Sequence, residues 1–190
     1  MKQLAKKGAG AFLLFLGLLL IINSLWIRVK PRLADVLLRS AWERTVKDDQ
    51  PAKAWPWADT HPTARLKAVH LGIDHIVLEG DSGEVLAFGP GHVSGSAQPL
   101  SRGNCILVGH RDTSFTFLKD LRIDDTIIIH DAKNRTGIYR VQSTMIAAVD
   151  DLYFKETRES WLTLITCYPF EGLSPATDKR YLVFARLVDS

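Results

Sequence analysis

Cysteine is scarce in this sequence: the chain of 190 residues holds two, Cys105 and Cys167. They lie 62 positions apart, which excludes the C-x-x-C pair that thiol–disulfide redox enzymes use. Both lie inside apolar, strand-like runs, and two thiols buried in strands do not make the disulfide framework of a small secreted protein. Each thiol is therefore either a packed core side chain or a nucleophile.

Acidic residues are absent from the first 32 positions, which carry six of the 24 basic residues. The other 158 residues carry 18 basic and 21 acidic side chains, a net charge of −3. A domain that binds nucleic acid needs a basic face of its own. The charge distribution therefore argues against a nucleic-acid partner.

Charge of either sign is missing from residues 8–27, GAGAFLLFLGLLLIINSLWI. Twenty residues of helix rise about 30 Å, the thickness of the hydrocarbon core of a bilayer. No A-x-A-like cleavage site follows, which distinguishes this run from a secretory signal peptide. We predict that residues 1–32 form a single-pass transmembrane anchor with basic flanks. Because the N-terminal tail is too short to hold a domain, the rest of the chain is expected on the periplasmic or extracytoplasmic side of the cytoplasmic (inner) membrane.

Residues 33–63 connect the predicted anchor to the rest of the chain. Apolar residues at helical spacing in 33–46 predict a juxtamembrane helix, and the polar, proline-containing stretch 47–63 predicts a linker. In residues 64–190, short β-prone runs alternate with turn residues, which predicts a mainly-β domain, either a closed barrel or a sandwich. A helical turn is expected at 114–121. Strands are expected at 64–71, 75–79, 84–88, 104–109, 125–130, 136–149, 161–167 and 180–188.

Three of the expected strands present a chemically reactive side chain where they begin or end. Cys167 ends the run LTLITC, His110 follows ILVG, and Arg180 opens RYLVFARLV. A cysteine nucleophile needs a base, and acyl transfer needs a positive or N–H donor for the oxyanion. Singly, each residue has an ordinary alternative: a core cysteine, a structural histidine or a solvated arginine. Together they indicate a nucleophile, an acid–base group and an oxyanion stabiliser.

The same residues lie in three sequence blocks, GHRDTSF at 109–115, TLITC at 163–167 and KRYLVFA at 179–185. These blocks, in this order within about residues 64–188, resemble the signature of the sortases, which are membrane-anchored cysteine transpeptidases. The segment WPWADT at 55–60 and the wording GHRDTSF are most similar to the sortases of Gram-negative bacteria, the class GN or marine proteobacterial group. The resemblance implies an eight-stranded sortase-type β-barrel with short helices, preceded by one transmembrane helix.

The resemblance also implies a reaction. Cys167 would attack the threonine carbonyl of an LPXTG-like sorting signal near the C-terminus of an exported client protein and form an acyl-enzyme. His110 would protonate the leaving amine and later deprotonate an amine acceptor, while Arg180 would hold the substrate carbonyl and its developing charge. Weaker substrate-binding roles are expected beside the nucleophile and in the 150–160 loop, which reads the signal in this family: Thr166, Leu152, Tyr153 and Phe154.

Two alternatives stay open. Water could open the same acyl-enzyme, which would make the chain a sequence-specific cysteine protease of the hydrolase class, or the barrel could be a non-catalytic, membrane-anchored binding module. No cofactor is expected. No metal is expected either, because residues 89–103 contain no Asp or Glu for calcium and the histidines lack ligand spacing. We expect Cys105 in the core, and Asp112 in a surface turn or beside His110 as its orienting group.

Overall fold

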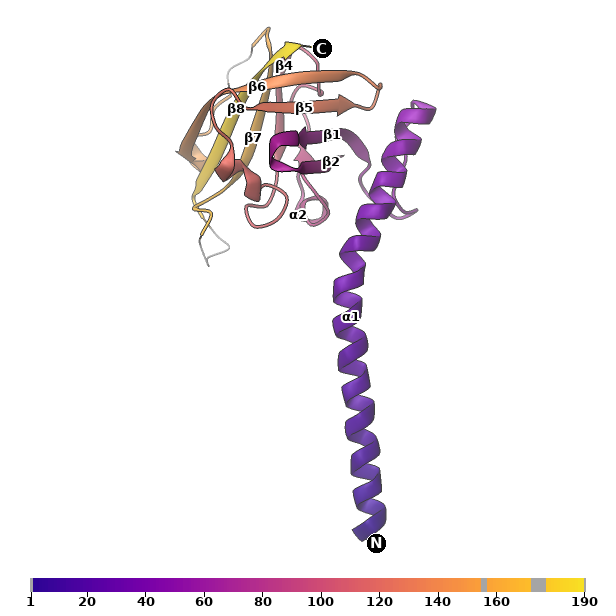
Figure 1. Cartoon of the computed structure of the whole chain (residues 1–190). Helices are drawn as coiled ribbons and strands as arrows, with labels where there is room; N and C mark the ends of the chain where they lie inside the picture. Colours follow the sequence, from indigo (N-terminus) through magenta and orange to yellow (C-terminus); the bar gives the residue numbers. More distant parts are fainter. Residues whose placement is uncertain (1, 155–156, 172–176, 190) are drawn as a thin grey trace. The chain divides into compact units, whose positions relative to one another are not determined.

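The structure is a computed structural model that describes residues 2–154, 157–171 and 177–189, without the side chains of residues 2–14, 26–28 and 31. The chain forms two compact units, residues 1–37 and 38–190. Figure 1 shows a long N-terminal helix and a barrel of strands. The barrel belongs to the second unit, and it contains every residue that the sequence analysis singled out for chemistry.

The N-terminal helix, α1, spans Lys2–Asp48 as one element. The sequence analysis expected two helices here, an anchor within residues 1–32 and a juxtamembrane helix at 33–46, and that division is not observed. Among the residues searched, which are those with described side chains, no helix is long and apolar enough to cross a membrane. The structure therefore gives the predicted transmembrane helix no support. Residues 8–14 and 26–27 of that predicted span lie outside the described side chains.

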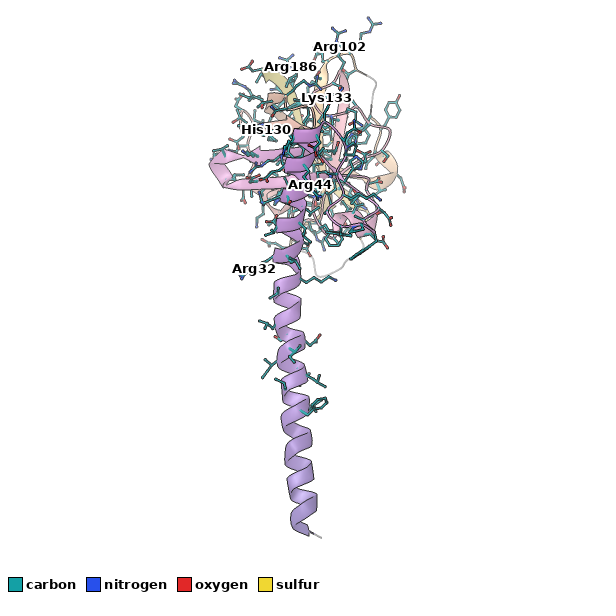
Figure 2. The ribbon with its side chains drawn as sticks, turned by 90° about the vertical axis from the view of Figure 1, so that its right-hand side faces the viewer. Arg32, Arg44, Arg102, His130, Lys133 and Arg186 are labelled. Carbon is teal, nitrogen blue, oxygen red and sulfur yellow. The ribbon has the colours of Figure 1, made fainter. Side chains whose placement is uncertain are left out.

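The last turns of α1, residues 38–48, belong to the barrel unit. Leu38 and Trp42 lie one helical turn apart and are buried with Ile76 and Leu78 of the second strand in a small apolar cluster. Arg44, labelled in Figure 2, donates a hydrogen bond to the carbonyl of residue 53 at 2.9 Å. The boundary between the two units thus falls inside the predicted segment 33–63, after residue 37. Residues 38–63 of this segment belong to the same unit as the barrel.

Eight strands form a closed barrel in the order β1-β2-β3-β4-β7-β8-β6-β5. The β2–β3 and β4–β7 pairs are parallel and the others are antiparallel. Closure gives each of these strands a neighbour on both sides. The strands are β1 (Pro62–Ala68), β2 (Ile73–Glu79), β3 (Gly91–His92), β4 (Gly103–Val108), β5 (Thr126–Asp131), β6 (Thr136–Ala148), β7 (Ser160–Tyr168) and β8 (Lys179–Asp189).

One predicted strand is wrong. The run at 84–88 forms a short helix, α2 (Gly83–Leu86), because the Ser82 side chain caps its start by accepting a hydrogen bond from the backbone N–H of Val85 at 3.3 Å. The eighth strand is instead β3, inside the predicted 89–103 connection. Gly91 permits this pairing, because a Cβ there would lie 2.1 Å from the carbonyl oxygen of Gly80.

The barrel interior is filled by alternate side chains of its strands. In β5, Ile127 and Ile129 are buried while their neighbours at 126, 128 and 130 are more exposed. Cys105 of β4 is in the same core cluster. The predicted helical turn at 114–121 is present as the 3-10 helix η2 (Thr116–Asp120), which adds Phe117 and Leu118 to that cluster.

The two ends of the barrel differ in the side chains that they present. Arg102, just before β4, and Arg186, near the end of β8, lie toward the upper end of the barrel in Figure 2. His110 follows the opposite end of β4, and Arg180 begins β8. The three residues predicted for catalysis therefore belong to the other end of these strands.

Candidate active site

Cys167 lies at the end of β7, on the outer surface of the barrel wall. Leu162 and Leu164 belong to the core, so strand alternation turns the side chains of 163, 165 and 167 to the other face. Pro169 follows directly after the strand ends and cannot donate to a further ladder hydrogen bond. The thiol of Cys167 is free and half-buried. It is held on a rigid strand and remains accessible.

Arg180 is the direct partner of Cys167 across the antiparallel β7–β8 pair. Residues opposite each other in such a pair have Cβ atoms about 5 Å apart on the same face. The Nη1 group of Arg180 donates hydrogen bonds to the backbone carbonyls of Thr177, at 2.7 Å, and Lys179, at 3.0 Å. Its Nε and Nη2 groups make no hydrogen bond to the described residues, so among these residues the guanidinium retains unused donors.

His110 follows β4 and begins a tight turn. The Phe115 N–H donates to the His110 carbonyl at 2.9 Å, which closes this turn. The turn needs glycine at 109, because a Cβ there would lie 2.8 Å from atoms of Ser114 and Phe115. The imidazole of His110 is exposed. The turn therefore places a solvent-accessible ring beyond the strand end.

Two hydrogen bonds hold the ends of β4 and β7 together. The hydroxyl of Thr166, 2% exposed, donates to the Gly109 carbonyl at 2.7 Å, and the Gly109 N–H donates to the Ile165 carbonyl at 3.2 Å. The residue before Cys167 is thus hydrogen-bonded to the residue before His110. The Gly109 carbonyl uses the hydroxyl proton of Thr166, and the expected substrate contact of Thr166 remains a prediction.

A cavity of about 620 Å³ lies where these elements meet, and both Cys167 and His110 border it. Its other walls come from β2, from the end of α2 with the residues that follow it, and from the turn after β4. They include a half-buried histidine and two charged residues that follow His110: His75, Arg111 and Asp112. Asp112, expected in a surface turn or beside His110, is exposed at the border of this cavity.

A second hollow, of about 180 Å³, is mainly aromatic. Tyr153 and Phe154 border it, as does Trp161 of β7. Leu152 is half-buried and is not among the residues that form this hollow. Of the predicted 150–160 loop, residues 155–156 are outside the described residues, as are residues 172–176 of the 168–179 connection.

Some of these residues were missed by the sequence analysis. Trp161 and Phe184 reach the aromatic hollow from neighbouring strands, and His75 and Phe88 reach the larger cavity from a strand and a loop far away in sequence. Trp161 and Phe184 could have been found only as side chains on the outer face of a predicted strand. No local pattern marks His75 and Phe88, because the closure of the barrel brings them to the site.

The described residues contain no group of three or more His, Cys, Asp or Glu side chains that could hold a metal ion. Cys105 is buried in the core at 1% exposure, as expected. Burial, with a smaller contribution from Glu79, raises the pKa of its thiol to about 12. This thiol therefore stays protonated and unreactive at neutral pH.

The chain is similar to known proteins over the barrel. A family model described as the sortase domain matches residues 66–188. Sortase D of Bacillus subtilis is 31% identical over 114 residues, 59% of this chain and 57% of the relative, so the chain matches just over half the length of that protein.

Solved structures show the same likeness. Sortase A from Corynebacterium diphtheriae has a TM-score of 0.62 and 26% identity, covering 70% of this chain and 64% of that one. A sortase D5 transpeptidase of Clostridium perfringens has a TM-score of 0.67 over 83% of this chain and 99% of that one, and its 20% identity supports the fold alone. The predicted likeness to the Gram-negative group is not confirmed. With the family model covering most of the barrel, the chain belongs to the sortase family.

Proposed function

We propose that the chain is a cysteine transpeptidase that acts on a C-terminal sorting signal of an exported protein. Sortases are generally cysteine transpeptidases that attach proteins to the cell envelope, and the chain belongs to this family. The observation that carries the proposal is the arrangement around Cys167. The thiol borders one cavity with His110 and lies opposite Arg180 in the β7–β8 pair.

In the proposed reaction, the Cys167 sulfur attacks the threonine carbonyl of an LPXTG-like signal. The oxyanion that forms receives hydrogen bonds from Arg180, whose planar group stays charged and offers several donors. His110 donates a proton to the departing amine, which leaves a thioester on Cys167.

The aromatic hollow supports a place for the upstream part of the signal. Thr163 of β7 borders it, four residues before Cys167 on the same face of the strand. Four strand residues extend about 13 Å, so an extended peptide with its scissile carbonyl at Cys167 reaches this hollow with an upstream side chain. Tyr153 and Phe154 would contact that side chain, as expected for an apolar position of the signal.

Intact-mass spectrometry tests the proposal. The protein is incubated with peptides that carry LPXTG-type signals, quenched in acid and weighed. We expect a mass increase equal to the upstream half of the peptide, and its transfer to an amine added before quenching. A peptide of the same composition in scrambled order is the matched control. Absence of adduct and of cleavage with every signal of this type would contradict the proposal.

Hydrolysis is the second candidate, because Cys167 is only half-buried and water can reach a thioester there. The same experiment separates the two outcomes. A transpeptidase gives the amide whenever a suitable amine is present, whereas a cysteine protease gives the free acid with and without the amine. A non-catalytic binding barrel would bind the peptide without an adduct.

The cellular location is a proposal from the sequence alone. We propose that the uncharged run at 8–27 tethers the chain to the cytoplasmic membrane, with the barrel on the extracytoplasmic side where exported clients arrive. Membrane fractionation tests this when the full chain is compared with a variant that lacks residues 1–32. Recovery of both in the same fraction would contradict the tether.

A further inference from the structure

Arg111 connects the turn after β4 to the chain that follows β7. Its Nη1 group donates a hydrogen bond to the Pro169 carbonyl at 2.7 Å, across 58 positions of sequence. Arg111 directly follows His110, and Pro169 is the second residue after Cys167. The two side chains proposed for proton transfer and for nucleophilic attack therefore lie next to the two ends of one hydrogen bond.

The geometry of this hydrogen bond suits it to fixing a distance. A guanidinium donor makes the bond charge-assisted, and 2.7 Å lies at the short end of the range for such bonds. Arg111 is half-buried, and it borders the cavity of about 620 Å³ that Cys167 and His110 also border. Its side chain therefore passes from the cavity border to the end of β7.

The chain on the acceptor side of this bond leaves the sheet directly after Cys167. Tyr168 is the last residue of β7, and Pro169 has no N–H with which to extend the ladder. Phe170 then packs against the core cluster of the barrel. The bond from Arg111 holds the carbonyl between these two residues, so it fixes the path of the chain where β7 ends.

The chain on the donor side carries His110. The imidazole of His110 is exposed, so packing in the core does not fix its position. Its backbone carbonyl accepts a hydrogen bond from the Phe115 N–H at 2.9 Å, which holds the turn together but does not connect it to β7. Arg111 lies inside this turn and supplies such a connection.

Another hydrogen bond joins the same two segments on the other side of the reactive residues. The Thr166 hydroxyl donates to the Gly109 carbonyl at 2.7 Å, one residue before Cys167 and one residue before His110. The bond from Arg111 lies after both residues. Two segments that are joined at one point can pivot about it, whereas two separate points also fix their relative orientation.

We propose that Arg111 is a positioning residue for acyl transfer, and that its bond to Pro169 holds the His110 turn at a fixed distance from Cys167. A proton donor must lie within hydrogen-bond reach of the leaving group, and a misplacement of about 1 Å can cost about 100-fold in rate. This inference rests on the proposed transpeptidase function and adds a residue that the sequence analysis did not single out.

Two other roles for Arg111 predict different measurements. A cation that attracts the peptide changes the KM, and added salt weakens that effect. A bond that only stabilises the fold changes the free energy of unfolding and leaves the kcat of the folded protein unchanged. A positioning bond lowers kcat at saturating peptide, and a substitution that keeps the donor restores it.

The kinetic test compares Arg111→Met with Arg111→Lys in the full-length protein. Methionine keeps an unbranched apolar stem without a donor, whereas lysine keeps a donor and the charge. For Arg111→Met we expect kcat for peptide cleavage to fall about 10-fold or more, with the KM within about twofold and no dependence on salt. Arg111→Lys should recover about a third of the wild-type kcat or more, because the bond to Pro169 uses a single donor.

Lys119→Met is the matched control. It removes one positive charge from an exposed residue of η2 that does not border the cavity, and it should leave both constants unchanged. Urea unfolding of each variant separates a loss of rate from a loss of fold. A kcat of Arg111→Met within about twofold of the wild type, or an equal loss in Lys119→Met, overturns the inference and leaves the proposed function standing.

A second measurement does not depend on activity. Amide NMR spectra are recorded for Arg111→Met and Arg111→Lys in the Cys167→Ala background. The amide nitrogen of Phe170 is bonded to the Pro169 carbonyl carbon, so loss of the hydrogen bond should shift its signal in the methionine variant and much less in the lysine variant. Changes confined to residues 110–115 would show that Arg111 does not connect the two segments and would overturn the inference. A wild-type protein that forms no thioester counts instead against the proposed function.

Discussion

Cys105 and Cys167 lie on neighbouring strands of one barrel wall, and their surroundings differ in every respect that matters for reactivity. The strands β4 and β7 are parallel partners, so each thiol has the same kind of backbone around it. Cys105 points into the core, is 1% exposed and has a pKa raised to about 12 by burial. Cys167 ends its strand on the other face, borders a cavity and lies opposite an arginine. Strand position and facing direction, rather than the residue type, separate a packing thiol from a candidate nucleophile.

The largest expected effect is a difference in kcat between two variants, each of which lacks one thiol. Cys167→Ala should lower kcat for the proposed acyl transfer by at least about 10⁴-fold, because loss of a nucleophile removes the covalent route. Cys105→Ala should keep kcat within about twofold and lower the free energy of unfolding by about 1 kcal/mol, because a small buried side chain is lost. Peptide cleavage assays and urea unfolding of both variants check this.

The comparison fails if the activity losses are reversed or equal. Circular dichroism and the urea midpoint of Cys167→Ala are the control, because the variant must fold for its loss of activity to be informative. A folded Cys167→Ala variant with full activity would show that the thiol at the end of β7 is not the nucleophile.

Alkylation should distinguish the thiols without any substrate. Iodoacetamide should react with Cys167 in the native protein and reach Cys105 only through unfolding. The rate at Cys105 should therefore be lower by a factor of about 10³ or more, set by the fraction of unfolded protein. Peptide mapping after timed quenches measures both rates. If the two thiols instead react at comparable rates in buffer, Cys105 must be exposed by local opening of the folded barrel.

The sequence was most informative about the reactive side chains at the ends of strands. Cys167, His110 and Arg180 were placed at the ends of three strands by the change from apolar runs to polar or turn residues, and those strands are present. The roles of the three residues remain proposals. Seven of the eight strands matched a predicted run, because alternation and turn residues are local signals.

A local cap and several non-local contacts explain what the sequence analysis did not predict. The run at 84–88 resembles a strand, but the Ser82 side chain caps a helix there, and the close approach of Gly91 to Gly80 accompanies the very short strand that follows. His75 and Phe88 reach the cavity through barrel closure, which no local pattern encodes. The hydrogen bond from Thr166 to Gly109 joins residues 57 positions apart, so it could not be predicted from a local pattern either.

That bond gives the next prediction. Thr166→Val keeps the shape of the side chain but removes the donor to the Gly109 carbonyl, so the ends of β4 and β7 can separate slightly. We expect kcat to fall by about 10- to 100-fold, since small misplacements of reacting groups are costly. The KM for the peptide should change little. Thr166→Ser retains the donor and should recover most of the rate.

The outcome of the Thr166 pair decides between two roles. A rise in the KM for the peptide with kcat unchanged would restore the substrate-binding role expected from the sequence. Equal losses in the valine and serine variants would instead mean that the hydrogen bond alone does not explain the effect, because only serine keeps the hydroxyl.

The smallest effect uses the core thiol alone and depends on pH. The folded-state pKa of Cys105 is about 12, whereas an exposed thiol ionises near 8.5. Between these values the unfolded chain binds fewer protons than the folded chain, so the free energy of unfolding must fall as the pH rises. We expect a loss of about 2 kcal/mol between pH 7 and pH 10 from this thiol. Urea unfolding at several pH values should show a shallower alkaline decline in Cys105→Ala than in the wild type. Cys167 is present in both proteins and cancels from the difference, so identical declines would mean that folding does not raise the pKa of Cys105 and that burial in β4 does not set this thiol apart.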